Sequence, residues 1–471
     1  MKQEDKVVEH EGVTKRSNFW SGALFGVLAG MGSLLTYQYF SGILRHPRLI
    51  SKEILSNEDQ FENREALAIF IAAENLRSAI QNCLLTNGLS KEVLNAGYRN
   101  FRESWARDFG FASYGLLVLE QYATVKDTLE AFFWHQTDEG QFPIKLHSIN
   151  VLTRFFYSLL EREQPIQVML RPKFISGHGT ASLDGQAMLI IAAQNYAWQT
   201  EDTDFLQHHW SQLKLAIHWL QLHRRRPGGL LLHQFAYSDW ADSVARRGRV
   251  LYTNVVYWKA LASMSEAAAS LGIKQQAEFY AEEAQKVSQA IQAQFWSPEL
   301  GYFVTSARLN QLSSDGNLLA IAWGLASPEQ AESILKVMAE ARMGEPVPTR
   351  VAYPSYPRSL IAIENILAGM ANYHTEAAWL WIGAWHVVAA ARAKRMDEAQ
   401  ELIARITEII VRDRQVNEAY GPNGKPLSSI WYKSESPLTW NAGMVLYAFK
   451  VFETHPRTET NLFSMLNEIT E

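Results

Sequence analysis

The sequence predicts an all-α protein, a ring of six helical hairpins or (α/α)6 barrel, preceded by one transmembrane helix near the amino terminus. Three observations lead to this prediction. From about residue 60 onward, apolar residues recur at the three- and four-residue spacing of helices. Strand-like alternation of apolar and polar residues is scarce. Segments that combine Trp and Asp return about every 60 residues, as repeated hairpin units would produce.

Composition limits the class of protein. The chain has 471 residues, of which 47% are hydrophobic, so it can bury a large core and is far too apolar to be disordered. The net charge is -5, with acids and bases mixed along the chain, so no nucleic-acid partner is expected. The single cysteine, Cys83, excludes an intramolecular disulfide framework and a cysteine-based zinc site.

The first 60 residues divide into a polar tail (1–18), an apolar anchor (19–44) and a linker (45–60). No charged residue occurs from Phe19 to Phe40. This uncharged segment is as long as a helix needs to be to cross a bilayer. The apolar run begins too far from Met1, and is too long, for a cleaved signal peptide. We therefore expect an uncleaved, single-pass membrane anchor.

The anchor also carries glycines at four-residue spacing, namely Gly22, Gly26 and Gly30. Such a row places small residues on one helix face, which favours self-association, although glycine is also common in membrane helices that do not associate. Basic residues flank the run on both sides, so the sequence does not determine which side of the membrane the main domain occupies.

The remainder, residues 61–471, is predicted to be one domain of about a dozen helices. The clearest helical patterns are Ala66–Ile80, Phe205–Leu222, Asn254–Leu271, Gln276–Phe295, Glu329–Ala341 and Met396–Arg412. Short loops rich in Gly, Pro, Asp and Ser separate them. A closed ring of hairpins would return one loop of each hairpin to the same rim. An open helical solenoid shares the pattern and remains an alternative.

Three segments combine carboxylates with aromatic rings. The first, Ser104–Gly110, holds Trp105, Arg107 and Asp108. An Arg and an Asp next to a Trp can hold neighbouring sugar hydroxyls by charge-assisted hydrogen bonds, while the ring provides an apolar floor. An ion pair at the start of a helix would give the same pattern.

The second segment, Tyr237–Ser243, holds Asp239 and Asp242. Their spacing predicts that they share one face of a helix start. Aromatic rings and a neighbouring carboxylate can raise the pKa of one of them, as a general acid requires. Helix capping by Ser238 or Asp239 is the structural alternative.

The third segment, Val416–Pro426, places Glu418 just before a tight turn and shortly before the last long helix. A lone Glu in a loop is usually solvated, so Glu418 gains meaning only together with the other two segments. Cleavage of a glycosidic bond needs one carboxylic acid to protonate the leaving oxygen. A second carboxylate activates water or attacks the sugar.

Taken in order from Tyr98 to Phe449, these segments resemble the α/α-toroid glycoside hydrolases. That group includes neutral/alkaline invertases, amylo-α-1,6-glucosidases of glycogen debranching enzymes and processing α-glucosidases. Trp105–Phe109 is similar to the W-x-R-D-F segment that binds sugar at the cleavage subsite, and Ser182–Asp184 to the S-x-D before a long helix. Asp239–Asp242 is similar to D-W-M-D, in which the second Asp donates the proton.

Two further segments complete the resemblance. Tyr373–Trp381 is similar to the pocket segment Y-H-x-G-x-x-W-P-W, but has Glu376 in place of glycine and Leu380 in place of proline. Asn417–Gly421 looks like the E-x-x-D-G turn that carries the catalytic base, without the Asp of that turn.

The resemblance implies an (α/α)6 enzyme that hydrolyses a glucosyl or related linkage of a disaccharide or oligosaccharide by inversion, with Asp242 as acid and Glu418 as base. The substrate-binding residues that it implies are Trp105, Arg107, Asp108, Asp184, Asp239, Trp240, His374, Trp379, Trp381 and Trp440. No metal or organic cofactor is expected, because the sequence has no zinc motif, phosphate loop or dinucleotide fingerprint.

Two other functions fit the same pattern. A sugar epimerase or polysaccharide lyase would use His or Tyr for proton transfer, and His178 and His374 are available. A non-catalytic, membrane-bound carbohydrate-binding protein would keep the aromatic floor but turn Glu418 outward. The position of these side chains relative to the pocket distinguishes the three.

Overall fold

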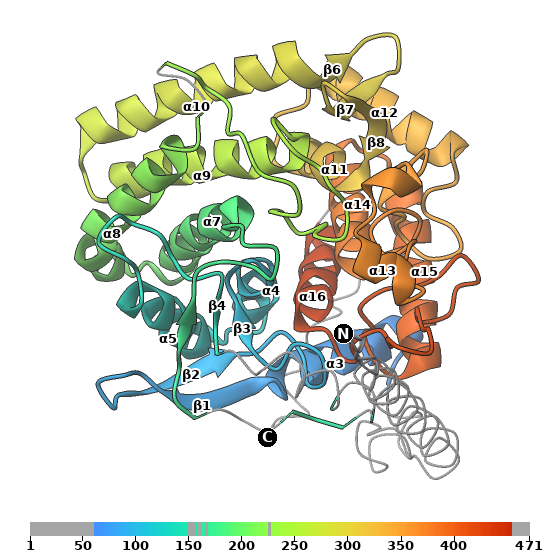
Figure 1. The fold of residues 1–471 in the computed structure, drawn as a ribbon, viewed down its shortest axis with the longest axis horizontal. Helices are drawn as coiled ribbons and strands as arrows, with labels where there is room; N and C mark the ends of the chain where they lie inside the picture. The colour runs from blue at the N-terminus through green and yellow to red at the C-terminus, as the bar shows by residue number, and fades with distance from the viewer. Residues whose placement is uncertain are drawn as a thin grey trace, which may run out of the picture. The chain divides into compact units, whose positions relative to one another are not determined.

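An inner and an outer layer of helices alternate along the chain in the computed structural model (Figure 1). The structure describes residues 61–147, 157, 160, 162–164, 168–224 and 228–454. All of them belong to the unit Ile50–Glu471. The predicted anchor, residues 19–44, lies outside the described residues. No helix in the described part is both long and apolar enough to cross a bilayer.

Six helices form an inner ring in which each packs on the next. They are α4 (Ala106–Val118), α7 (Leu183–Thr200), α9 (Leu251–Ser270), α11 (Ser314–Ala322), α14 (Leu380–Arg392) and α16 (Thr439–Glu453). The last of them, α16, lies between α14 and α4 and so closes the ring (Figure 1). Closure distinguishes a toroid from a solenoid, in which each repeat contacts only its neighbours and the two ends remain apart.

Each inner helix follows an outer helix in the chain, which gives six hairpins. The outer helices are α3 (Arg64–Arg77), α5 (Tyr122–Trp134), α8 (Thr203–Gln221), α10 (Lys274–Phe295), α12 (Pro328–Glu340) and α15 (Met396–Asp413). The predicted six-hairpin fold is therefore confirmed for the described residues.

The burial of side chains explains the two layers. Every residue of α11 is buried, and so is almost every residue of α14, because these helices are covered on all sides. The outer helix α10 buries only one stripe, at the three- and four-residue spacing of a single face: Tyr280, Ala284, Val287, Ile291 and Phe295. Its remaining surface is mostly polar and faces solvent, with Phe279 as an exposed aromatic exception.

The ring closes through glycines. A Cβ atom built on Gly115 of α4 would lie 2.4 Å from the Cα of Gly443 in α16. A Cβ on Gly443 would in turn lie 2.7 Å from the Cα of Ala112. No real side chain tolerates such distances, so the two helix backbones can approach this closely only because both positions are glycine.

Short strands, which the periodicity did not predict, decorate the helical ring. One hairpin joins β1 (Ile80–Leu84) to β2 (Ser90–Leu94). A three-stranded sheet contains β3 (Ser104–Trp105), β4 (Lys145–Leu146) and β5 (Pro172–Lys173). A four-stranded sheet contains β6 (Trp296–Ser297), β7 (Tyr302–Ser306), β8 (Leu309–Ser313) and β9 (Ala352–Tyr353). Neighbouring strands in these sheets run antiparallel, and several strands are too short to leave an alternating pattern.

Several of the predicted site residues lie at one end of the inner ring, just before its helices begin. Trp105 directly precedes α4, Trp379 precedes α14, and Leu438 precedes α16. A short 3-10 helix, η2 (Arg358–Leu360), and helix α13 (Ile363–Leu367) lie in the long connection between β9 and α14. The amino-terminal ends of the inner helices therefore carry the candidate site.

Candidate active site

A single pocket brings together side chains from segments far apart in the sequence. The empty space that it encloses, including the part open to solvent, is about 410 Å³. Most of its lining was predicted from the sequence: Trp105, Arg107, Asp108, Trp240, Asp242, His374, Trp379, Glu418 and Trp440. The remaining lining residues are Phe101, Tyr373 and Leu438.

Glu418 is held rigidly in the buried part of this pocket. Only 1% of its surface is exposed. Its Oε2 accepts hydrogen bonds from the Tyr432 hydroxyl at 2.7 Å and from the backbone N–H of Glu435 at 2.7 Å, and its Oε1 accepts one from the Tyr373 hydroxyl. The side-chain amide of Asn441 also donates to the backbone carbonyl of Glu418 at 2.8 Å. The direction of the carboxyl group is thus fixed from several sides.

Burial raises the pKa of Glu418 to about 7, while the three hydrogen bonds to the carboxylate act in the opposite direction. Both protonation states are therefore populated near neutral pH. A carboxyl group with such a pKa can accept a proton from water more readily than an ordinary Glu, because its basicity is closer to that of the working solution.

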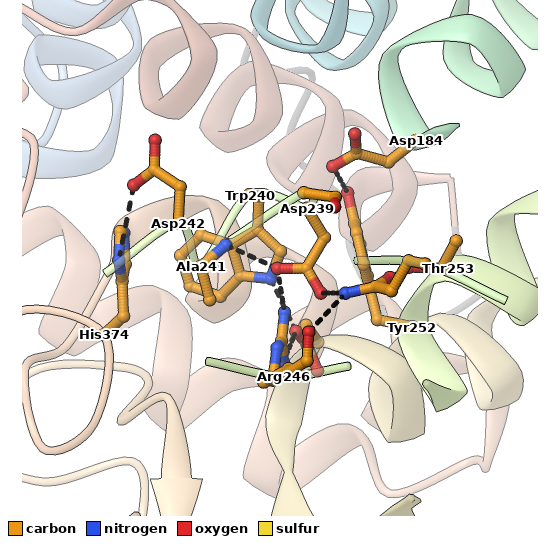
Figure 2. Close-up of polar contacts among 12 residues, drawn as sticks. Asp184, Asp239, Trp240, Ala241, Asp242, Arg246, Tyr252, Thr253 and His374 are labelled. Carbon is orange, nitrogen blue, oxygen red and sulfur yellow. Dashed lines mark hydrogen bonds and ion pairs between the residues drawn. The ribbon is translucent and has the colours of Figure 1, made fainter. Parts of the chain in front are cut away.

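Asp242 presents its carboxyl group to the pocket quite differently. Its side chain is 49% exposed, and its Oδ1 lies 3.9 Å from Nδ1 of His374 (Figure 2). Desolvation by the pocket walls raises the pKa of Asp242 to about 6, and the positive charges of Arg107 and His178 limit the increase. The group can therefore exist as a neutral acid at mildly acidic pH while remaining accessible to a ligand.

His374 is neutral, and its tautomer follows from its neighbours. The backbone N–H of Ser243 donates to Nδ1 at 3.3 Å, so Nδ1 is an acceptor and the ring proton is on Nε2. The hydroxyl of Ser243 also lies 2.9 Å from Nδ1. Burial, together with the charges of Arg246 and Arg107, holds the pKa of His374 well below its ordinary value. His374 can donate a hydrogen bond to a sugar, but it is poorly suited to proton transfer.

The spacing predicted that Asp239 and Asp242 share one face of a helix start, and this prediction is wrong. Residues 239–243 form an irregular loop, and neither Asp239 nor Ser238 caps a helix there. Asp239 turns away from the pocket. Its Oδ1 forms an ion pair with Arg246 at 2.8 Å and accepts a hydrogen bond from the backbone N–H of Ala241 at 3.0 Å (Figure 2). Because Asp–x–x–Asp here forms a turn around a buried arginine, the two carboxylates point to different surroundings.

That arginine anchors the loop. Arg246 is fully buried and also donates to Asp315 at 2.8 Å. Asp315 in turn accepts from the indole N–H of Trp240 at 2.5 Å, which fixes the ring that lines the pocket beside Asp242. Neither Arg246 nor Asp315 was predicted as part of the site, because an isolated Arg or Asp gives no sequence signal of a buried ion pair.

Arg107 and its partners form the opposite wall. Its Nη1 lies 3.3 Å from Asp184, its Nε lies 3.8 Å from Asp108, and its guanidinium lies 5.6 Å from the ring centre of Trp440. Burial raises the pKa of Asp108 to about 6, and Arg107 opposes that shift. Asp184 is fully buried behind Arg107 and does not line the pocket. It orients the arginine instead of facing a ligand.

Of the tryptophans near the site, some line the pocket and one is buried beneath it. The rings of Trp240, Trp379 and Trp440 line the pocket, whereas Trp381 is fully buried and stacks under Trp440 at 4.5 Å. The ring of Trp105 is partly exposed, and Lys145 lies over it at 4.4 Å. Some tryptophans of this chain therefore line the pocket, and Trp381 fills the core beneath them.

Glu435 is the most informative residue that sequence reasoning missed. Its side chain is fully buried and accepts backbone N–H groups from Arg99 and Phe101, each at 3.1 Å, and from Asn100. Its own backbone N–H donates to Glu418. Glu435 therefore connects the loop that places Phe101 in the pocket with the buried carboxylate. A single Glu within a Ser-rich loop offers no pattern that would reveal this role.

One departure from the family pattern proves to lie outside the pocket. Glu376, which replaces a glycine, is exposed and accepts from the Ser355 hydroxyl at 2.8 Å. The replacement thus leaves the neighbouring pocket residues His374 and Trp379 in place.

Residues 145–345 match the model of the bacterial α-L-rhamnosidase six-hairpin glycosidase domain. This part of the chain is therefore similar to a six-hairpin glycosidase domain. This result confirms the predicted resemblance to α/α-toroid glycosidases and the prediction of a glycoside hydrolase. Asp242 lies inside the matched range, and Glu418 lies beyond it.

Solved structures of glycosidases share the fold of this glycosidase domain. One is a rhamnosidase from Klebsiella oxytoca with rhamnose bound, with a TM-score of 0.59 and 15% identity over 82% of this chain and 64% of that one. The chain thus spans just under two thirds of that rhamnosidase. Another is a GH63 mannosylglycerate hydrolase from Thermus thermophilus in complex with glucose, with a TM-score of 0.56 and 14% identity over 82% of this chain and 99% of that one. No curated protein matches the chain in sequence.

Proposed function

We propose that the glycosidase domain removes a terminal glucosyl or related sugar from an oligosaccharide or disaccharide by inversion of the anomeric centre. The observation that carries the proposal is that two carboxyl groups in different surroundings, Asp242 and Glu418, line one pocket. One is accessible at the pocket surface and the other is buried, as an acid and a base with separate tasks require.

The burial gradient suggests how the substrate is seated. Glu418 lies in the buried part, so the terminal sugar would fill the pocket over the rings of Trp240, Trp379 and Trp440. His374, as a neutral donor, and the Arg107–Asp108 pair would bind its hydroxyls. The leaving group would lie on the side of Asp242, whose carboxyl group is half exposed.

In the proposed reaction, protonated Asp242 donates its proton to the glycosidic oxygen as the bond to the anomeric carbon breaks. Glu418 accepts a proton from a water molecule as the oxygen of that water bonds to the anomeric carbon from the opposite face. The products are a free sugar of inverted configuration and an alcohol. A second step then exchanges the protons of the two carboxyl groups with solvent.

Two observations favour hydrolysis over the alternatives. A lyase or epimerase would use His or Tyr to transfer protons. His178 does not line the pocket. Nδ1 of His374 accepts a hydrogen bond from Ser243 while the pKa of His374 is low, and burial raises the pKa of Tyr373 well above its ordinary value. A purely carbohydrate-binding protein would be expected to turn Glu418 outward, whereas the carboxyl group lies in the pocket. The named relatives act on or bind rhamnose, mannosylglycerate and glucose, which supports a hexose or deoxyhexose as the terminal sugar.

The test is an activity screen of the full-length protein in detergent against α- and β-linked glucosides, mannosides and rhamnosides and against sucrose. We expect hydrolysis of one class, with the first-formed anomer inverted when followed by NMR. Asp242→Asn and Glu418→Gln should each lower turnover at least about 100-fold without loss of folding. Retention of configuration, or full activity of Glu418→Gln, would contradict the proposal.

We also propose that residues 19–44 tether the enzyme to a membrane as a single pass, with pairing of these segments along Gly22, Gly26 and Gly30. The support is the uncharged run in the sequence. Deletion of residues 1–44 should move the protein from the membrane fraction to the supernatant, with the thermal melting of the helical domain, followed by circular dichroism, unchanged. Aggregation of the truncated chain would contradict the tether.

A further inference from the structure

The loop that carries Asp242 is the end of a hairpin that spans residues 233–249. Gln234 and Gly248 pair through two backbone hydrogen bonds of 2.9 Å. The side chains of Gln234 and Arg246 point inward and are buried. Three other side chains of the same hairpin are at least partly exposed: Phe235, Arg247 and Arg249.

These exposed side chains form one wall of a second hollow, outside the catalytic pocket. Its other walls are Gln294, near the end of α10, and the turn 306–308 between β7 and β8. The hollow is an open groove of about 1950 Å³, against about 410 Å³ for the catalytic pocket. Phe235, 72% exposed, contributes an aromatic face to it.

The groove is positively charged. Its lining includes Arg247, Arg249, Arg308 and His233, and none of the described lining residues is an Asp or a Glu. Among the described residues, no ion pair joins the three arginines to a carboxylate, and Arg249 donates to the neutral amide of Gln294, at 3.1 Å. The chain as a whole has a net charge of -5, so this excess of arginine is local to the groove.

The groove and the catalytic pocket share no described lining residue, but one hairpin contributes to both: Phe235 and Arg247 line the groove, and Asp242 lines the pocket. Tyr237 has a backbone φ of 62°, and its ring stacks on His178 at 4.6 Å. His178 is close enough to Asp242 for its charge to act on that carboxyl group. Phe235 is two residues from Tyr237, so their Cα atoms lie within about 7 Å of each other.

We infer that the groove binds the acidic part of a glycan on the leaving-group side of the scissile bond. Guanidinium groups bind carboxylates and sulfates with two parallel hydrogen bonds, and Phe235 can stack on the apolar face of a sugar ring. Carboxylated and sulfated sugars present the same chemistry to these arginines. The inference rests on the proposed function for its direction, since the hairpin that carries Asp242 also carries the groove residues Phe235 and Arg247.

Binding without turnover tests the groove separately from the reaction. The full chain in detergent would carry Glu418→Gln, and its affinity for polygalacturonate, dextran sulfate and neutral dextran would be measured by gel-shift electrophoresis. The groove variant combines Arg247→Gln, Arg249→Gln and Arg308→Gln. A matched control removes three exposed cations elsewhere: Lys286→Gln, Lys336→Gln and Arg342→Gln.

We expect the parent to bind one of the acidic polysaccharides at least tenfold more tightly than dextran, with affinity that falls as salt is raised to about 0.5 M. The polymer that binds identifies the anionic group. The groove variant should lose at least tenfold of this affinity, and the control should lose none. Equal binding by the groove variant, no preference over dextran, or equally tight binding of single-stranded DNA would overturn the inference. Absence of hydrolysis in the activity screen would overturn the proposed function and leave this binding result intact.

Discussion

The two carboxyl groups of the pocket are held in opposite ways. Glu418 is buried and accepts three hydrogen bonds, from Tyr373, Tyr432 and the backbone of Glu435. Asp242 is half exposed, and His374 lies 3.9 Å from its carboxyl group. A base must aim a water molecule at one carbon atom, so a rigid setting suits it. An acid must reach leaving groups of different shape, so a looser and more accessible setting suits it.

The difference also concerns what lies behind each group. Glu418 depends on a fully buried network that includes Glu435 and Asn441. Asp242 depends on a loop anchored by Arg246, which bonds to Asp239 and Asp315 and not to Asp242 itself. The structure therefore orients the base through its own side chain and the acid through its backbone.

The largest expected effect is on turnover, and it distinguishes the base Glu418 from the acid Asp242 by the leaving group of the substrate. Glu418→Gln should lower turnover at least about 100-fold on every substrate, because water must be activated whatever leaves. Asp242→Asn should cause a similar loss on sugar leaving groups but less than about tenfold on a dinitrophenyl glycoside, since that group leaves without a proton. Steady-state kinetics on both substrates would measure this. Equal losses for Asp242→Asn on the two substrates would remove its assignment as the acid.

The next effect tests whether the rigidity around Glu418 matters. Glu435→Gln should lower kcat by about ten- to 100-fold with a smaller change in KM, because the carboxylate of Glu418 and the loop of Phe101 would both shift. Removal of the negative charge of Glu435 should also lower the pKa of Glu418, since that charge contributes to raising it. The pH profile of kcat/KM would report this shift, which a loss of folding alone would not produce. Asp239→Asn perturbs the loop that carries Asp242, so it should leave the part of the pH profile that reports the pKa of Glu418 unchanged.

A smaller effect concerns the pH dependence of the unmodified enzyme. The productive state has Asp242 protonated and Glu418 ionised, and the two groups have pKa values of about 6 and about 7. We therefore expect a narrow bell in kcat/KM, which falls below about pH 6, where both are protonated, and above about pH 7, where both are ionised. A plateau that extends above pH 8 would show that activity does not require protonated Asp242, and a plateau that extends below pH 5 would show that it does not require ionised Glu418.

The smallest effect is on stability. Because the pKa of Glu418 is raised from 4.5 to about 7 in the folded state, the folded protein binds its proton more tightly than the unfolded chain does. The free energy of unfolding should fall as pH rises from about 4.5 to 7 and lose this dependence above 7. The melting temperature of Glu418→Gln, relative to that of the parent, should therefore increase as pH is raised from 5 to 8. Asp242→Asn should show a weaker change, since its side chain is half in solvent.

Much of the fold could be predicted because it depends on patterns that repeat. The outer helices alternate buried and exposed faces, as α10 and α15 do, and such stripes are visible in the sequence. The closure of the ring by Gly115 and Gly443 could not be predicted, because it depends on a contact between residues more than 300 positions apart. The two-residue strands were missed because two residues are too few to show the alternation of apolar and polar side chains that marks a strand.

The site was predictable where chemistry requires an unusual combination of residues within a few positions, as at Trp105–Asp108 and Asp239–Asp242. It was not predictable where a common residue acquires its role from distant partners. Glu435 and Arg246 owe their importance to burial and to groups that the chain brings from elsewhere. The helix start expected at Asp239 was wrong for the same reason: a buried arginine stabilises a turn there in place of a helix cap.

The contact between α4 and α16 has a consequence for the order of events during synthesis. Helix α4 begins at Ala106, but its partner α16 is complete only at Glu453. Until that last helix leaves the ribosome, the ring is open and the buried faces of α4 and α14 lack a cover. A nascent chain of this kind cannot complete its pocket, because Trp440 and the residues that hold Glu418 arrive last. Contacts of such long range slow folding and leave apolar surface exposed meanwhile, so maturation of this enzyme should depend on chaperones and should fail in chains that stop short of α16.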